Sequence, residues 1–201
     1  MSHNTWIHRM VRPTVVKPLA GTPVTPNQLT TARLLAGLTA AGIMAIGPAW
    51  QGIAAGVFVL SVVLDRADGD LARLTGKTSP GGHRYDMIAD AVCNALILIG
   101  LGIGLREGGE GSIPMGVLAG LSVAVILWMV MRMEEMGGHR AAELPSLGGF
   151  DADDAVLLIP AFVWLGMAEG LLTAAAIIAP LVAVLFFGMF RRQLARSAKP
   201  E

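Results

Sequence analysis

The chain has 201 residues, of which 54% are hydrophobic and only 15% are charged, and its mean hydropathy is +0.62. Soluble domains carry about a quarter charged residues, so this composition excludes an ordinary soluble domain and indicates a single membrane domain. The formal net charge is zero, which argues against a nucleic-acid-binding protein. The single cysteine, Cys93, cannot form an internal disulfide, and we expect a small core residue there.

The first part of the chain, residues 5–20, mixes apolar and basic side chains, and its two prolines would interrupt a long helix. We expect residues 1–24 to form a short amphipathic interfacial segment on the membrane surface, with Trp6 at the level of the lipid headgroups. The alternative is a mobile basic tail. The next residues, 25–30, have the pattern of a helix start, because Thr25 is a good N-cap and Pro26 suits the first turn.

Apolar segments occupy most of the remaining chain. A helix that crosses a membrane needs about 20 residues, so the shorter segments must extend into flanking polar residues. We predict an all-α integral membrane protein with six transmembrane helices in a domain over residues 25–192, followed by a cytoplasmic tail over 193–201. The expected spans lie at roughly 32–46, 52–64, 82–105, 113–131, 155–167 and 171–190.

Six spans would put both termini on one side of the membrane, and the basic residues indicate which side. Only Arg106 is expected on the opposite side, and Arg33 is expected close to the side of the termini. The positive-inside rule therefore places the termini in the cytoplasm and the protein in the inner, cytoplasmic membrane. The other basic residues expected on that side are Arg9, Arg12, Lys17, Arg66, Arg73, Lys77, Arg84, Arg132, Arg140, Arg191, Arg192, Arg196 and Lys199.

Four aspartates lie where the second span ends and the third begins. One stripe of the first helix carries two carboxylates and two residues with almost no side chain, at i, i+3, i+4 and i+7: Asp65, Asp68, Gly69 and Ala72. One face of the next helix carries residues at i, i+4 and i+8: Gly82, Asp86 and Asp90. A short polar turn joins the two helices, so we expect them to lie antiparallel and to bring the four carboxylates together.

Convergent carboxylates repel one another unless a cation lies between them. Ligand sets made of oxygen atoms suit a hard divalent ion such as Mg²⁺ or Mn²⁺. Gly69 and Ala72 leave room for a bulky ligand against the backbone, and Arg73 can offer two N–H groups to a phosphate. Together these features suggest phosphoryl-group transfer. The alternatives are a solvated helical hairpin at the membrane edge and an Arg73 that only neutralises nearby acids.

The pattern resembles the signature of the CDP-alcohol phosphotransferase family, D-x2-D-G-x2-A-R followed after a spacer by G-x3-D-x3-D. This chain fills every fixed position of it, with Asp65, Asp68, Gly69, Ala72, Arg73, Gly82, Asp86 and Asp90. The resemblance is tight over residues 65–90 and extends more loosely to residues 25–30 and to the hydropathy of the whole chain.

The resemblance implies a reaction and a set of roles. A phosphoalcohol group, with phosphatidyl as the first choice, would move from a CDP-alcohol to an acceptor hydroxyl with release of CMP, in phospholipid biosynthesis. Two Mg²⁺ or Mn²⁺ ions would be held by Asp65, Asp68, Asp86 and Asp90, with Asp90 also the catalytic base. The residues implied to contact the CDP-alcohol are Asn27, Gln28, Leu29, Thr30, Gly69, Ala72, Arg73, Ser79 and Gly82.

The family is usually dimeric, which implies a homodimer here. Gly100 and Gly104 form a GxxxG pair on the third expected span, and this face would either pack helices within the chain or join two chains. Many family members that make phosphatidylglycerophosphate or phosphatidylserine place Lys or Arg directly after the fourth Asp. This chain has Ala91 there, which weakens both assignments and leaves the acceptor alcohol open.

A divalent-cation transporter or channel is the alternative function, because it would also need acidic residues on facing helices. A transport site normally lies near the middle of the bilayer and opens to both sides. Here the acids are expected at one edge of the membrane, and Arg73 would repel a passing cation. Both points favour an enzyme whose active site faces the cytoplasm.

Overall fold

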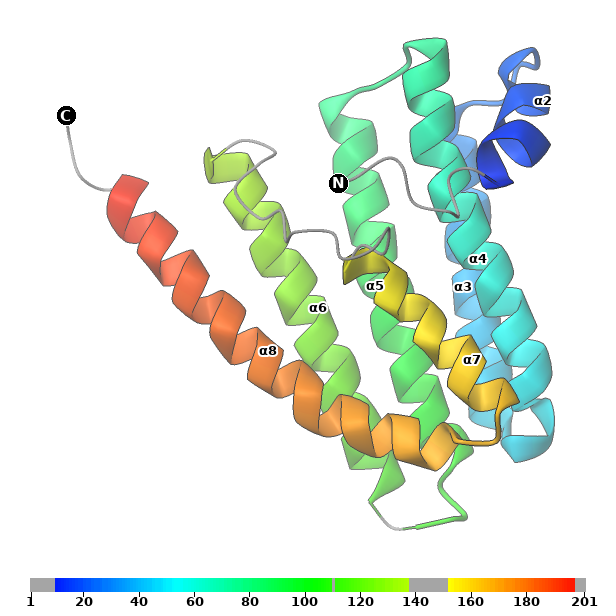
Figure 1. Ribbon diagram of the computed structural model, residues 1–201, viewed down its shortest axis with the longest axis vertical. Coiled ribbons are helices and arrows are strands. Elements are labelled where there is room, and N and C mark those ends of the chain that lie inside the picture. The colour runs from blue at the N-terminus through cyan, green and yellow to red at the C-terminus, as the bar shows by residue number, and fades with distance from the viewer. Residues whose placement is uncertain (1–9, 110, 138–151, 198–201) are drawn as a thin grey trace.

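The computed structural model describes residues 10–109, 111–137 and 152–197, which form helices and no strands. The all-α expectation is therefore confirmed for these residues. The long helices are α3 (Pro26–Ile46), α4 (Pro48–Thr75), α5 (Pro80–Gly104), α6 (Ser112–Gly137) and α8 (Ala168–Ser197). The shorter elements are a π-helical turn η1 (Arg12–Val16), α2 (Lys17–Ala20), a 3₁₀ turn η2 (Ala152–Leu157) and α7 (Leu158–Trp164). Figure 1 shows α3, α4, α5 and α6 as an up-and-down bundle, with α8 leaning along α6.

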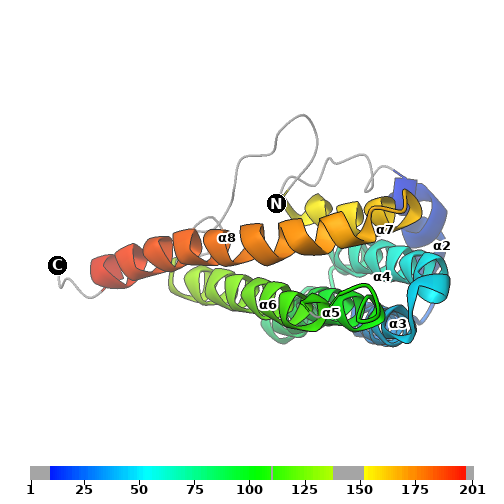
Figure 2. The same ribbon diagram turned by 90° about the horizontal axis from the view of Figure 1, so that it is seen from below.

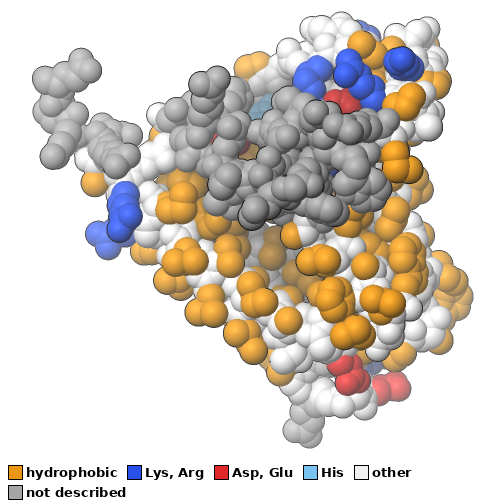
Figure 3. Space-filling model, viewed as in Figure 1, with side chains coloured by type: hydrophobic (Ala, Val, Ile, Leu, Met, Phe, Trp, Pro, Cys, Tyr) orange, Lys and Arg blue, Asp and Glu red, His pale blue; other side chains and the backbone are white. Residues whose placement is uncertain are grey.

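In the described part of the chain, five helices are long and apolar enough to cross a membrane, namely α3, α4, α5, α6 and α8. They indicate a multi-pass membrane protein. Figure 3 shows hydrophobic side chains over the middle of one face, with basic side chains towards the end that carries α2 and at the far end of α8. Figure 2 shows α7 and α8 lying on one side of the bundle formed by α3 to α6.

The sixth span that we expected at 155–167 is a shorter apolar helix, Ala155–Trp164. At 1.5 Å per residue such a helix is much shorter than the roughly 30 Å of a bilayer core, so the six-span count is not confirmed. However, α6 and α8 run in the same direction, since Gln193 near the end of α8 donates to the carbonyl of Met133 near the end of α6 at 3.0 Å. The chain between them therefore returns to the opposite end of the bundle.

Glycines bring the backbones of neighbouring helices into contact. A Cβ atom at Gly100 of α5 would lie only 2.5 Å from the carbonyl oxygen of Ala41 in α3, and one at Gly104 would collide with the carbonyl of Met44. A Cβ atom at Gly102 would lie 2.5 Å from the Ser112 carbonyl at the start of α6. The GxxxG pair thus packs α5 against α3 within one chain, which was one of the two expected uses of that face.

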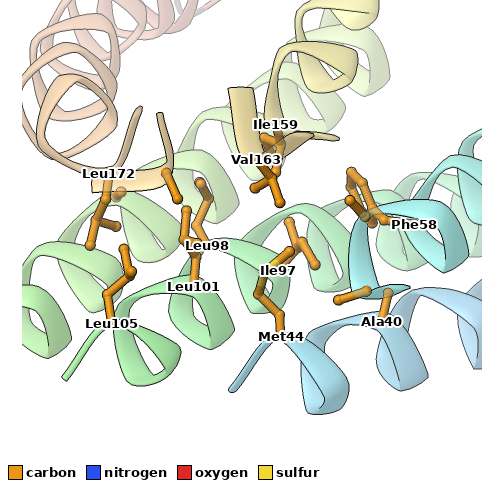
Figure 4. Close-up of a cluster of buried hydrophobic side chains, with 14 of the residues drawn as sticks. Ala40, Met44, Phe58, Ile97, Leu98, Leu101, Leu105, Ile159, Val163 and Leu172 are labelled. Atoms are coloured by element: carbon orange, nitrogen blue, oxygen red, sulfur yellow. The ribbon is translucent and has the colours of Figure 1, made fainter. Parts of the chain in front are cut away.

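A cluster of buried hydrophobic side chains joins α3, α4, α5, α7 and α8 (Figure 4). Met44, Phe58, Ile97 and Leu101 are each no more than 1% exposed, and Leu172 reaches them from α8. In a bilayer such a core is stabilised by close packing rather than by transfer out of water. It fixes the spacing of the helices below the acidic residues.

The N-terminal segment packs against the bundle where it is described. Val11 and Val16 are buried in a second cluster with Leu29 of α3 and with Ala67 and Leu71 of α4. The segment is helical from residue 10, but its expected position as an amphipathic helix on the membrane surface is not confirmed. Trp6 lies outside the described residues.

Candidate active site

The ends of three helices build the site. Thr25 caps α3 in a capping box, in which its hydroxyl accepts from the Gln28 N–H and the Gln28 side chain accepts from the Thr25 N–H. The helix α4 ends at Gly76, whose left-handed φ of 67° favours glycine. The helix α5 starts at Ser79, whose hydroxyl accepts from the Gly82 N–H at 3.0 Å. These caps place the last turns of α4 and the first turns of α5 at one end of the bundle.

The helix α3 lies between α4 and α5 over most of their length, and α4 and α5 contact each other little. The two helices that we expected to pack against each other, α4 and α5, are therefore separated by α3. The Ser61 hydroxyl of α4 donates to the Arg33 carbonyl of α3 at 3.0 Å. Gly37 of α3 has no side chain because a Cβ there would collide with the Cys93 sulfur of α5. Cys93 is buried, as expected for a core residue.

Three of the four predicted carboxylates converge. Asp65, Asp68 and Asp86 each offer an oxygen atom, and these atoms all lie within 4.8 Å of one another. Asp68 is only 3% exposed, and its Oδ2 accepts a 2.7 Å hydrogen bond from Thr30 Oγ1. Three carboxylate oxygens at this spacing fit a hard divalent cation.

Asp90 lies beside this triad rather than within it. Its Oδ1 accepts hydrogen bonds from Asn94 Nδ2 at 3.1 Å and from Arg33 Nη2 at 2.5 Å. The sequence predicted all four aspartates as metal ligands and Asp90 as the base as well. Asp90 is not among the three carboxylates that converge, and its roles as a metal ligand and as the base stay predictions.

Arg33 occupies the centre of the acidic group, and sequence reasoning missed this role. Its side chain is 2% exposed, Nη1 pairs with Asp65 and with Asp86 at 2.6 Å, and Nη2 pairs with Asp90. From the sequence, Arg33 is expected only as a basic residue close to the cytoplasmic side. One signal was present in the sequence: Thr30, Arg33 and Gly37 are spaced i, i+3 and i+7, and a cation on one face of an apolar span needs a partner.

The residues implied to bind the CDP-alcohol divide into two groups. Asn27, Ser79 and Gly82 come together, because a Cβ atom at Gly82 would lie 3.0 Å from Ser79 Oγ and 3.2 Å from Asn27 Oδ1. On α4, the Arg73 guanidinium lies over Gly69, with Nη2 at 3.4 Å from the position of a Cβ atom, and donates to Asp70 at 2.8 Å.

The other implied contacts have structural partners. Gln28 closes the capping box, and Leu29 is 8% exposed in the cluster with Val16 and Leu71. The Thr30 hydroxyl contacts Asp68, as described above. The Ala72 carbonyl accepts from the Lys77 N–H at 2.9 Å and so ends α4. Contacts of these four residues with a nucleotide stay predictions.

The first turns of α5 are also tied to their neighbours by polar contacts. Tyr85 shares a 3.0 Å hydrogen bond with the Thr31 hydroxyl of α3, and His83 Nε2 lies 3.1 Å from a carboxylate oxygen of Glu134 in α6. Arg84 lies 3.7 Å from a carboxylate oxygen of Glu135. These contacts hold the glycine-containing start of α5 in place.

Fold and site together define an all-helical membrane protein that carries a carboxylate cluster able to hold a metal ion, with two half-buried glycines beside it. Comparison with known families makes this class specific. The family model described as CDP-alcohol phosphatidyltransferase matches residues 23–147, which is more than half of the chain. The chain therefore belongs to the CDP-alcohol phosphatidyltransferase family. Members of this family are CDP-alcohol phosphotransferases that use a divalent metal ion.

Two curated relatives are similar to part of the chain. The bifunctional IPC transferase and DIPP synthase of Rubrobacter xylanophilus is 36% identical over 91 residues, which are 43% of this chain and 19% of that protein. The archaetidylinositol phosphate synthase of Pyrococcus horikoshii is 36% identical over 101 residues, which are 47% of this chain and 53% of that protein. The similarity thus spans about a fifth and about half of the lengths of these relatives.

Proposed function

We propose that this protein transfers a phosphoalcohol group, with phosphatidyl as the first choice, from a CDP-alcohol to an acceptor hydroxyl with release of CMP, in phospholipid biosynthesis. The observation that carries the proposal is the convergence of Asp65, Asp68 and Asp86 within 4.8 Å. The family match supports the reaction class. Gly69 and Gly82 carry no side chain next to the carboxylates, and a diphosphate gains room to approach there when the Arg73 guanidinium turns away from Gly69.

The carboxylates would hold the metal. Asp65, Asp68 and Asp86 would be the main ligands, and Asp90 would help to hold a second ion. Bound Mg²⁺ or Mn²⁺, two ions per site, would neutralise the diphosphate charge and stabilise the leaving phosphate oxygen. The donor set favours these two ions because it contains only oxygen.

The protein residues would orient the donor and move one proton. Asn27, Ser79 and Gly82 border the nucleotide, and Arg73 turns from Asp70 to the diphosphate with its two N–H groups. Gln28, Leu29, Thr30 and Ala72 shape the backbone around it. The acceptor oxygen forms a bond to the β-phosphorus, the bond from that phosphorus to CMP breaks, and the hydroxyl proton passes to the Asp90 carboxylate.

The place of the site suits a reaction between a lipid and a water-soluble substrate. The ends of α3, α4 and α5 that form it are flanked by basic residues, including Arg12, Lys17 and Lys77. The positive-inside rule places this end in the cytoplasm, and we propose an enzyme of the inner, cytoplasmic membrane that acts as a homodimer. A divalent-cation transporter gains no support from the comparisons. The carboxylates lie in the halves of α4 and α5 that are nearer the turn between these helices.

The test uses the purified full chain in detergent. CDP-diacylglycerol and a small CDP-alcohol are each offered as donors to a panel of acceptors, and products are read by mass spectrometry. Inositol phosphate opens the panel because one relative is named an archaetidylinositol phosphate synthase. We expect CMP release that stops when the metal is chelated and that Asp68→Ala abolishes. No CMP release with any donor, or release unaffected by chelator, would contradict the proposal.

A further inference from the structure

Arg33 is a cation supplied by the protein at the place where a metal cation is expected. Its guanidinium pairs through Nη1 with Asp65 and Asp86, which are two members of the carboxylate triad. Through Nη2 it pairs with Asp90, which lies beside the triad. One rigid planar group thus joins the metal-binding carboxylates to the proposed base.

We propose that Arg33 is a positioning residue with two separable roles: Nη1 competes with the metal for Asp65 and Asp86, and Nη2 fixes the orientation of the Asp90 carboxylate. The first role concerns metal binding alone. The second rests on the proposed function, because it takes Asp90 to be the proton acceptor. The two roles belong to different nitrogen atoms of one side chain.

Burial makes the competition strong. Arg33 is 2% exposed, so water screens its charge little, and its attraction to the carboxylates exceeds that of a surface ion pair. The backbone of Arg33 is held by Ser61, and the absent side chain at Gly37 lets α3 approach α5 one turn further on. The guanidinium therefore cannot leave the acidic group by a simple movement of its helix. A second cation must share the carboxylates with it, which lowers metal affinity.

The orientation role follows from where the contacts on Asp90 come from. Its Oδ1 accepts from Arg33 Nη2 of α3 and from Asn94 Nδ2 of its own helix. Two donors from different helices fix one carboxylate rotamer. A lysine ammonium is a single point charge, so it cannot make the fixed two-nitrogen contact with both Asp86 and Asp90.

The variants Arg33→Gln and Arg33→Lys separate the two roles, and Arg106→Gln is the control. Arg106 is an exposed arginine at the opposite end of α5 that bonds only to backbone carbonyls in the described contacts. Calorimetric binding of Mn²⁺ to the full chain in detergent is the first readout, with turnover and KM for the CDP-alcohol as the second. Each protein is purified with Mn²⁺ present and then dialysed.

Arg33→Gln should bind Mn²⁺ about tenfold more tightly than the wild type. A change in affinity of this size is typical when one group in a protein affects binding at another site. Arg33→Lys keeps the charge and should bind Mn²⁺ within about threefold of the wild type. Both variants should lose about tenfold or more in turnover with little change in KM, since base catalysis depends on geometry. Arg106→Gln should match the wild type in every measurement.

Unchanged or weaker Mn²⁺ binding by Arg33→Gln would overturn the competition role. Wild-type turnover by Arg33→Lys would overturn the orientation role. If Arg33→Gln does not survive dialysis, Arg33→Lys tests both the competition role and the orientation role. A Mn²⁺ affinity of Arg33→Lys that differs more than tenfold from the wild-type affinity would overturn the role of the Arg33 charge in the competition. If the wild type itself releases no CMP from any donor, the proposed function fails, while the calorimetric comparison still decides the competition.

Discussion

Thr30 Oγ1 of α3 donates a 2.7 Å hydrogen bond to Asp68 Oδ2 of α4, and both side chains are almost fully buried. A hydrogen bond of this kind fixes the rotamer of a metal-binding carboxylate. The Thr30 hydroxyl is thereby engaged with the carboxylate that we propose as a metal ligand. Thr30 therefore supports the proposed metal site, and its contact with the nucleotide stays a prediction.

Replacing Thr30 tests this support. Thr30→Val keeps the shape of the side chain and removes the donor, so Mn²⁺ affinity should fall about 10- to 100-fold, as is typical when a group behind a metal ligand is lost. Thr30→Ser keeps the hydroxyl and should retain most of the affinity. The measurement is Mn²⁺ binding by calorimetry. Equal affinities for the valine and serine variants would show that the hydrogen bond does not matter.

Asp68→Ala should abolish CMP release and lower Mn²⁺ affinity, because it removes the most deeply buried carboxylate of the triad. Thermal unfolding with and without Mn²⁺ checks that the variant is folded. Mn²⁺ should raise the unfolding temperature of the wild type and should raise that of Asp68→Ala much less, because a ligand stabilises the folded state more the more tightly it binds. Normal turnover by this variant in the presence of a chelator would rule out the triad as the metal site.

Gly69→Leu should prevent CDP-alcohol binding while the protein still folds. A side chain at this position meets the Arg73 guanidinium and covers the backbone beside the carboxylates. The matched control is Gly56→Leu on the same helix, where an added Cβ atom meets nothing within 4 Å. Calorimetric binding of a CDP-alcohol should be lost in the first variant only. The steric argument fails if both variants bind the nucleotide as the wild type does.

Asp90→Asn keeps the shape of the side chain and removes the proton acceptor. Turnover should fall by about 10²- to 10⁴-fold, the usual contribution of a general base, while CDP-alcohol affinity is largely kept. Steady-state kinetics and direct binding separate the two effects. Loss of nucleotide binding would make Asp90 chiefly a metal ligand, and turnover within a few-fold of the wild type would remove it as the base.

Cysteines placed at Lys77 and at Gly109 test the topology, because these residues lie at opposite ends of α5. A membrane-impermeant thiol reagent added to intact cells should label Gly109→Cys and not Lys77→Cys. Lysed cells should label both. The native Cys93 is buried and gives a low background. Labelling of both positions in intact cells would contradict a cytoplasmic active site.

Local patterns in the sequence predicted much of this molecule. The cap at Thr25 depends on neighbouring residues, and the acidic stripes depend on the spacing along one helix, so both could be predicted without the fold. Ser79 was expected only as a nucleotide contact, and its role as the N-cap of α5 came from the structure. The position of α3 between α4 and α5 depends on packing between distant segments, and it alone brings Arg33 to the aspartates. The span expected at 155–167 ends at Trp164, because apolar composition does not show where a helix ends.

The aspartates, Arg33 and every proposed nucleotide contact come from residues 27–90, one uninterrupted stretch of the chain that lies in α3, α4 and the start of α5. The helices after α5 contribute packing around this stretch and the Glu134 side chain that contacts His83 at the start of α5. Recombination in the later part of the gene can therefore exchange the supporting helices while the residues that we propose for the phosphate chemistry are inherited together.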